Sequence, residues 1–129
     1  MRKQYYFRQS SRGLLAWDVD RLVTLSRDFP ILPVPLSEIR ELEEPFSPEF
    51  DTSPTWKSMV EHMQLIENAD LSFPIILSAE GRVMDGMHRV IKALLAGRAT
   101  IDAVRFSTDP EPDYVDVDPG QLPYDELVP

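Results

Sequence analysis

The chain contains no cysteine among its 129 residues. This absence excludes a disulfide scaffold, a thiol nucleophile and a metal site built from thiolates. Only two histidines are present, so a zinc site would need carboxylates to complete it and is not expected. No stretch approaches the ~20 apolar residues of a membrane-spanning helix, and the N-terminus lacks the apolar run of a secretory signal. We therefore expect a soluble, cytoplasmic protein with no membrane partner.

Bases are missing from the end of the chain, and acids are missing from its beginning. Residues 109–129 carry seven acids and no base, whereas residues 1–13 carry four bases and no acid. The net charge of −9 repels the phosphate backbone of nucleic acids, so binding to duplex DNA is not expected. Residues 80–105 nevertheless hold five bases against three acids, and this local excess suits a small anion.

The length and the composition, 43% hydrophobic and 27% charged, are typical of one globular domain. We divide it into a basic arm with a short helix (1–30), a central domain (31–106) and an acidic, proline-containing tail (107–129). The start of the arm is either free or an edge strand, and Asp18 is the expected N-cap of the short helix. For the tail, disorder, an added strand and the docking of a partner stay open, and we expect the domain to fold without residues 113–129.

The central part predicts a mixture of strands and helices. The expected strands lie at 31–36, 73–77, 83–84 and 101–106, and the expected helices at 54–68 and 87–96. Two prolines confine the first strand to a sheet edge, and a glycine turn joins the second and third into a hairpin. Ser53 is the expected N-cap of the first helix, and Gly97 the residue that ends the second. This pattern indicates an α/β fold of the α+β type, with helices packed on a short mixed sheet.

Each of these two helices has one apolar face. The first helix presents Trp56, Met59, Val60, Met63 and Ile66 at helical spacing. The second is expected to bury Met87, Val90, Ile91, Leu94 and Leu95. His62 lies off the first face and is interpreted as a surface histidine. Trp17 and Trp56 are interpreted as core or staple residues rather than as stacking platforms.

The residues that carry chemistry are concentrated where the strand at 83–84 becomes the following helix. The stretch DGMHR occupies residues 85–89. The first turn of a helix leaves backbone N–H groups without partners and its dipole makes that end positive, so a phosphate fits there. Gly86 would let a ligand approach the backbone, and His88 can donate to an anion or carry a proton. Arg89 and Lys92 add positive charge on one side of the helix.

Two interpretations of this hinge stay open. In the first, Gly86, Met87, His88, Arg89 and Lys92 bind a phosphate group, and Asp85 acts as a base or a metal ligand. In the second, Asp85 is an ordinary N-cap and the basic side chains form a solvated face. The residue pattern by itself does not choose between them.

The hinge also resembles that of the ParB/sulfiredoxin-like superfamily. Its members carry a Gly-x-His-Arg stretch at the start of a helix that ends in an Ala-Gly pair, as Ala96-Gly97 does here. The similarity covers roughly residues 31–106, and residues 34–39 are similar to the entry strand and turn of ParB N-terminal-like domains. The free serine kinases of this superfamily carry Asp-Gly-His-His-Arg, which residues 85–89 match except at Met87. The resemblance implies a ParB-like fold that binds a nucleoside di- or triphosphate at the helix start, with Mg2+ as the expected ion.

Differences between this chain and the superfamily limit the functions that we expect for it. Sulfiredoxin chemistry needs a cysteine where Met87 stands, so it is excluded. In ParB a DNA-binding domain follows this module, and we expect no such partition-site binding here. We expect a nucleotide- or phosphate-binding protein, extending to a small-molecule kinase or a nucleotide hydrolase. In that case Asp85 would be catalytic and also a metal ligand. The related kinases recruit acids from their N-terminal part, so the resemblance also implies a base or magnesium ligand among Glu38, Glu41, Glu43 and Glu44. These four acids are otherwise interpreted as a solvated face, and Glu38 is the one we choose as catalytic.

Two other functions remain as alternatives. One is a non-enzymatic regulatory or interaction module whose acidic tail docks a basic protein. The other is a nucleic-acid accessory protein that uses the basic and aromatic arm to bind single strands.

Overall fold

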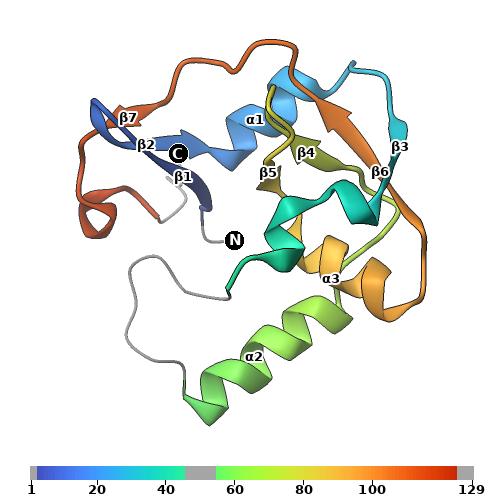
Figure 1. Cartoon of the computed structure of the whole chain (residues 1–129). Helices are drawn as coiled ribbons and strands as arrows, with labels where there is room; N and C mark the ends of the chain where they lie inside the picture. Colours follow the sequence, from blue (N-terminus) through green and yellow to red (C-terminus); the bar gives the residue numbers. More distant parts are fainter. Residues whose placement is uncertain (1–2, 46–54, 125–129) are drawn as a thin grey trace, which may run out of the picture.

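The computed structural model describes residues 3–45 and 55–124. Within these residues the chain forms three α-helices and two small sheets (Figure 1), which confirms the expected α+β class. One sheet is antiparallel with the strand order β1-β2-β7, and the other is mixed with the order β3-β6-β4-β5.

The elements have the following bounds. The first sheet contains β1 (Tyr5–Ser10), β2 (Gly13–Asp18) and β7 (Tyr114–Val115). The second sheet contains β3 (Leu32–Pro35), β4 (Ile75–Leu77), β5 (Val83–Asp85) and β6 (Thr100–Arg105). The α-helices are α1 (Val19–Ser26), α2 (Trp56–Glu67) and α3 (Met87–Leu95). Three short 3-10 helices are η1 (Leu36–Glu38), η2 (Arg40–Glu43) and η3 (Pro119–Gln121).

The four-stranded sheet is covered on both faces. On β4, Ile75 and Leu77 pack in one core with Val90 of α3. Ile76, which lies between them, packs in a second core with Trp17 of β2 and with α1. Successive side chains of a strand point to opposite faces, so this alternation places the sheet between two layers. Burial of each such apolar side chain stabilises the fold by about 1.5–3 kcal/mol.

Several local predictions are confirmed. β3 is an edge strand, as its two prolines require, and it pairs antiparallel with β6. β4 and β5 form the expected hairpin, with Gly81 at φ +85° in the turn. Gly97 follows α3 at φ +73°, and the bond from Arg98 N–H to the Ala93 carbonyl completes a Schellman motif.

Both long helices differ from expectation in what they bury. The N-cap of α2 is Thr55, which forms a capping box with Ser58; the expected cap, Ser53, lies outside the described residues. No residue of α2 is buried, and Trp56 is 85% exposed, so its interpretation as a core residue is wrong. In α3 only Val90 and Ala93 are fully buried, whereas Leu94 and Leu95 are exposed. The reason is that α3 lies on the sheet by the side that carries Val90. On the opposite side α2 contacts His88 and Lys92 of α3, and it leaves Leu94 and Leu95 exposed.

One strand, β2, is not predicted from the sequence. β2 pairs with β1 along its whole length, from Tyr5 opposite Asp18 to Ser10 opposite Gly13. The strand escapes prediction because three successive residues, 15–17, are buried, which hides the alternation of a half-exposed strand. β2 ends at Asp18, whose carboxylate accepts a hydrogen bond from Asp20 N–H at 2.9 Å, so the predicted N-cap of α1 is confirmed.

The acidic tail lies along the N-terminal hairpin and supplies it with a third strand. Figure 1 shows the tail running from β6 across α1 to β7. The N–H of Asp113 donates to the Ala16 carbonyl at 2.8 Å, and the indole Nε1 of Trp17 donates to the Pro110 carbonyl at 2.8 Å. Leu122 is buried. Of the three alternatives for the tail, the structure shows the added strand, and our expectation that residues 113–129 are dispensable for folding no longer follows.

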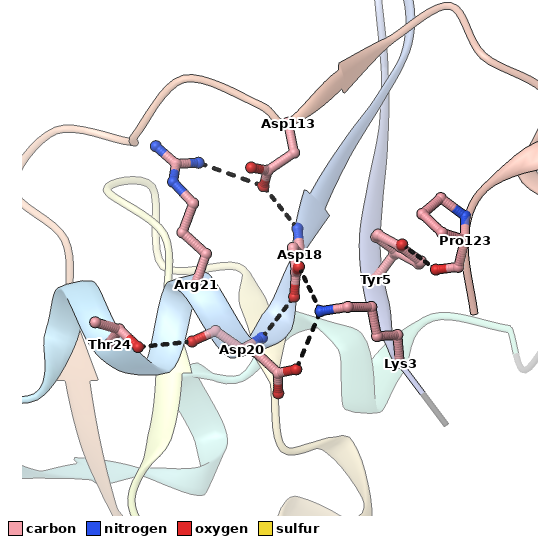
Figure 2. Close-up of polar contacts among 8 residues, drawn as sticks. All are labelled: Lys3, Tyr5, Asp18, Asp20, Arg21, Thr24, Asp113 and Pro123. Atoms are coloured by element: carbon pink, nitrogen blue, oxygen red, sulfur yellow. Dashed lines mark hydrogen bonds and ion pairs between the residues drawn. The ribbon is translucent and has the colours of Figure 1, made fainter. Parts of the chain in front are cut away.

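The bases at the start of the chain are neutralised by acids, Lys3 by Asp18 and Arg8 by Asp109 of the tail. Figure 2 shows Asp18 between Lys3 and Asp113: its carboxylate accepts from Lys3 Nζ at 2.9 Å, and its backbone N–H donates to Asp113 at 2.8 Å. The hydrogen bond to Asp18 raises the pKa of Lys3. Arg8 pairs in the same way with Asp109 at 2.9 Å. The opposite charges at the two ends of the sequence therefore meet in the fold.

Substitution of Asp109 tests how strongly the tail holds the structure together. Its carboxylate accepts from Arg8 Nη1 and from the N–H of Ala79, at 2.9 and 2.8 Å. We expect Asp109→Ala to lower the free energy of unfolding by about 2–3 kcal/mol, because both donors lose their acceptor in a half-buried place. Urea unfolding followed by circular dichroism measures this difference.

A matched control is Glu111→Ala. The side chain of Glu111 is 86% exposed and lies 3.9 Å from Arg12. Its removal is expected to change the stability by less than about 0.5 kcal/mol. Equal stability losses in the two variants would contradict the role given to Asp109.

Candidate functional site

The hinge that the sequence singles out is a glycine-capped helix start. Asp85 is the last residue of β5, and Gly86, at φ +111°, is the N-cap of α3. No side chain caps this helix, so the interpretation of Asp85 as an N-cap is wrong. Because Gly86 takes the N-cap position, Asp85 stays in the strand. The Asp85 carboxylate accepts a hydrogen bond from Arg89 Nη2 at 2.9 Å, one helical turn away.

Glycine is needed at position 86 for space as well as for conformation. A Cβ atom there would lie 2.6 Å from Cγ2 of Ile75 and 2.9 Å from Nη2 of Arg89. The hinge therefore passes directly over a core residue of β4. This close approach fixes the direction in which α3 leaves the sheet.

Arg89 is part of the packed structure and does not lie on a solvated face. Its side chain is 18% exposed and is paired with Asp85, which is similarly buried. Its Nε atom is buried and has no hydrogen-bond partner among the described residues. Arg89 thus positions the end of β5 against the start of α3, and its charge is already balanced by Asp85.

Two of the predicted site residues lie elsewhere. Lys92 Nζ donates to the carbonyls of Glu67 and Ala69, both at 2.7 Å, and so binds the C-terminal end of α2. Glu38 is exposed at the end of η1 and does not line either of the two cavities that include Gly86. Lys92 and Glu38 are therefore not part of the candidate site.

The hinge forms one wall of a groove, and β1 forms the opposite wall. A cavity of about 510 Å³ lies between Gly86, Met87 and His88 on one side and Lys3, Tyr5 and Phe7 on the other. A second cavity, of about 660 Å³, continues along β1 towards Glu41 and Arg82. The two cavities share the lining residues Tyr6, Phe7, Val83 and Met87. Because the tail holds the hairpin in place, the groove depends on the tail as well.

Three backbone donors lie at the hinge, and two of them belong to Met87 and His88, which line this groove. The first helical hydrogen bond of α3 runs from Val90 N–H to the Gly86 carbonyl at 3.0 Å. The N–H groups of Met87, His88 and Arg89 have no acceptor among the described residues. These are the donors that a helix start offers to an anion.

The ring of His88 packs against a second histidine. The His62 ring on α2 lies 4.9 Å from it, centroid to centroid, at an angle of 67°. Burial lowers the pKa of His88, and the neighbouring His62 lowers it further, while Asp85 acts in the opposite direction. His88 is therefore neutral near pH 7 and can donate or accept. The sequence gives no sign of this contact, because it arises only where α2 crosses α3.

Acidic groups also surround the hinge. A third cavity, of about 260 Å³, is lined by Asp70 and Asp85 together with His88 and Arg89. Hydrogen bonds from Ser72 lower the pKa of Asp70, which keeps its carboxylate charged. The hinge is thus a place of balanced charge, and its positive character comes from the helix start itself.

The basic arm is not an open patch for nucleic acids. Its described bases are Lys3, Arg8 and Arg12, and each lies within 4 Å of an acid. The aromatic side chains beside them also pack within the fold, since the Tyr6 ring lies 5.6 Å from that of Trp17. The arrangement does not favour a nucleic-acid accessory role.

No protein-family model matches this chain, and nothing among the curated proteins or the solved structures matches it. The resemblance to the ParB/sulfiredoxin-like superfamily therefore stays a prediction from the residues quoted above. In residues 3–45 and 55–124 no group of three or more histidine or acidic side chains gathers as a metal site. In the same ranges no helix has both the length and the apolar character to cross a membrane.

Replacement of Gly86 tests the geometry of the hinge. We expect Gly86→Ala to lower the free energy of unfolding by about 2–5 kcal/mol, because left-handed backbone strain adds to overpacking against Ile75. Gly97→Ala is the control: its φ is also positive, but a Cβ there meets nothing within 4 Å. It should cost only the backbone strain, about 1–2 kcal/mol. Thermal and urea unfolding measure both variants, and equal losses would contradict the close approach at Gly86.

The pair of histidines predicts a pH dependence. The pKa of His88 is lower in the folded protein than its ordinary value of 6.5, so the unfolded chain binds more protons below that pH. Stability should therefore fall as the pH decreases through that value, until His88 is protonated in the folded state too. NMR titration should place the pKa of His88 below the ordinary value, and His62→Gln should raise it. An unchanged His88 pKa in that variant would show that His62 has no influence.

Proposed function

We propose that the groove between β1 and the start of α3 binds a small phosphorylated ligand, with a nucleotide as the expected class. The observation that carries this proposal is the set of three backbone N–H groups, at Met87, His88 and Arg89, that lack an acceptor among the described residues. Met87 and His88 line the cavity of about 510 Å³, and all three residues line the smaller cavity of about 260 Å³ at the hinge. A phosphate group supplies several acceptor oxygens and the negative charge that a helix start favours. The cavity also has the size of small-molecule sites.

The residues around the groove suit the parts of such a ligand. Gly86 has no side chain, so a phosphate oxygen can approach the backbone closely. His88, neutral near pH 7, can add one N–H donor to those of the backbone. Tyr5 and Phe7 on the opposite wall provide aromatic surface for the base. Arg89 acts through Asp85, by holding the end of β5, rather than by direct contact.

Phosphotransfer or nucleotide hydrolysis would be an extension of this binding function. Asp85 is the one acid of the predicted catalytic pair that lies at the hinge, so it would act as the base or as the protein ligand of Mg2+. The phosphates would have to supply most of the other ligands, since the described residues form no metal cluster of their own. The proposal that the groove binds a nucleotide does not itself depend on magnesium.

The test is a titration of the 15N-labelled protein with ADP, ATP and inorganic phosphate. We expect the largest shifts at the amides of Met87, His88 and Arg89, which the ligand would engage directly. His88→Ala should weaken binding by about tenfold or more, because a hydrogen bond to a charged group contributes about 1.5–3 kcal/mol. Thermal shifts with the same ligands provide a second readout.

Arg98→Ala serves as the control, because Arg98 is an exposed base at the opposite end of α3. It should leave the affinity unchanged. If the protein binds none of the three ligands up to millimolar concentration, or if the amides of α3 do not respond, the groove is not a phosphate site.

A further inference from the structure

The helix α2 presents a large apolar face that nothing in the described chain covers. None of its twelve residues is buried, and Figure 1 shows it at the edge of the molecule, away from both sheets. The exposed apolar side chains of this face are Trp56, Met59, Val60 and Met63. An isolated helix of this length is marginal in water. An uncovered contiguous apolar patch is typical of an interaction surface.

The contacts that hold α2 in place leave this face free. Lys92 of α3 binds the carbonyls at its C-terminal end, and His62 packs on His88. Both contacts are made by the side of α2 that is turned towards α3. An α-helix turns by 100° per residue, so Trp56, Val60 and Met63 are rotated by about a quarter turn or more from His62 around the axis of α2. Their side chains therefore point to one side of α3 and not directly at it.

The same face has a protruding side chain at one end and a hollow at the other. Trp56 begins the helix and is 85% exposed. A cavity of about 430 Å³ lies near the end of the helix, between α2 and α3, and its apolar lining comes from Met63, Ile66, Leu95 and Ala96. Leu95 and the apolar face of α2 therefore form one continuous surface.

We propose that this surface joins two copies of the chain, with their α2 helices antiparallel about a twofold axis. In that arrangement the start of each α2 lies beside the end of the other, so each Trp56 enters the cavity of the partner subunit. A surface that carries both the knob and the hole is self-complementary, as a twofold interface requires. A central aromatic anchor in a pocket is also the usual source of binding energy in such interfaces.

The charges of α2 are complementary in this antiparallel arrangement. Lys57 lies near one end of the helix and Glu67 at the other, so the antiparallel arrangement brings each lysine to Glu67 of the partner subunit. The net charge of −9 opposes association in general. However, α2 itself carries only one lysine and two glutamates, so this repulsion is weak at the contact.

Sedimentation equilibrium over a range of concentrations tests the proposal with the full chain. The wild-type protein should dimerise, and Trp56→Glu should weaken the dimer by more than tenfold. The matched control is Leu32→Glu, which adds the same charge to an apolar residue that is 60% exposed on β3; it should leave the dimer unchanged. Circular dichroism confirms that both variants stay folded, and Trp56→Ala replaces Trp56→Glu if that variant does not.

A charge exchange tests the antiparallel arrangement separately. Lys57→Glu and Glu67→Lys should each weaken the dimer several-fold at low salt, and the double variant should restore it. A monomer at all concentrations would overturn the proposal and leave this face to a different protein. A dimer that is insensitive to Trp56→Glu, or one that the double variant does not restore, would overturn the contact proposed here.

Discussion

The ion pair between Arg8 and Asp109 connects three parts of the molecule that would otherwise be separate. Arg8 belongs to the N-terminal hairpin, Asp109 to the tail, and the second oxygen of Asp109 accepts from Ala79 in the turn between β4 and β5. The guanidinium also lies 4.9 Å from the ring of Trp17, whose indole bonds to the tail. Because these contacts fix the hairpin beside the four-stranded sheet, β1 becomes a wall of the groove. The candidate site therefore depends on a contact well outside it.

Local signals in the sequence were sufficient for most of the second sheet. Prolines, glycines and capping residues act within a few positions of themselves, so the edge strand, the hairpin turn at Gly81 and the end of α3 at Gly97 could be predicted. The N-cap Asp18 was found for the same reason. The strand β2 was missed because its burial comes from two distant partners, the tail and the four-stranded sheet. What an element packs against is a tertiary property, and the pattern of Leu15 to Trp17 does not contain it.

The sequence predicted where the hinge residues lie in the fold, but it predicted their contacts only in part. The glycine and the histidine stand at the helix start, as the pattern indicated. The roles of the charged residues differ from the prediction because each has a partner: Asp85 binds Arg89, and Lys92 binds the end of α2. The spacing of four between Asp85 and Arg89 is a local signal that could have indicated the first pair, whereas the contact of Lys92 with α2 is tertiary. A sequence shows that a residue is basic, but only the fold shows whether a neighbouring group already pairs with its charge. At this hinge the charged side chains are therefore paired, and the proposed binding of an anion depends mainly on backbone dipoles.

The pairing of the tail with the hairpin also bears on how the chain reaches its fold during synthesis. Arg8 and Asp109 are separated by 101 positions, and β2 is completed by β7 only after the helices between them have been made. While the chain emerges from the ribosome, the hairpin lacks both its third strand and the acids that neutralise it. Such long-range closure costs loop entropy and slows folding. Until the tail arrives, Trp17 and its apolar neighbours remain open to wrong contacts, so a strand translated late, β7, protects β2, which is translated early.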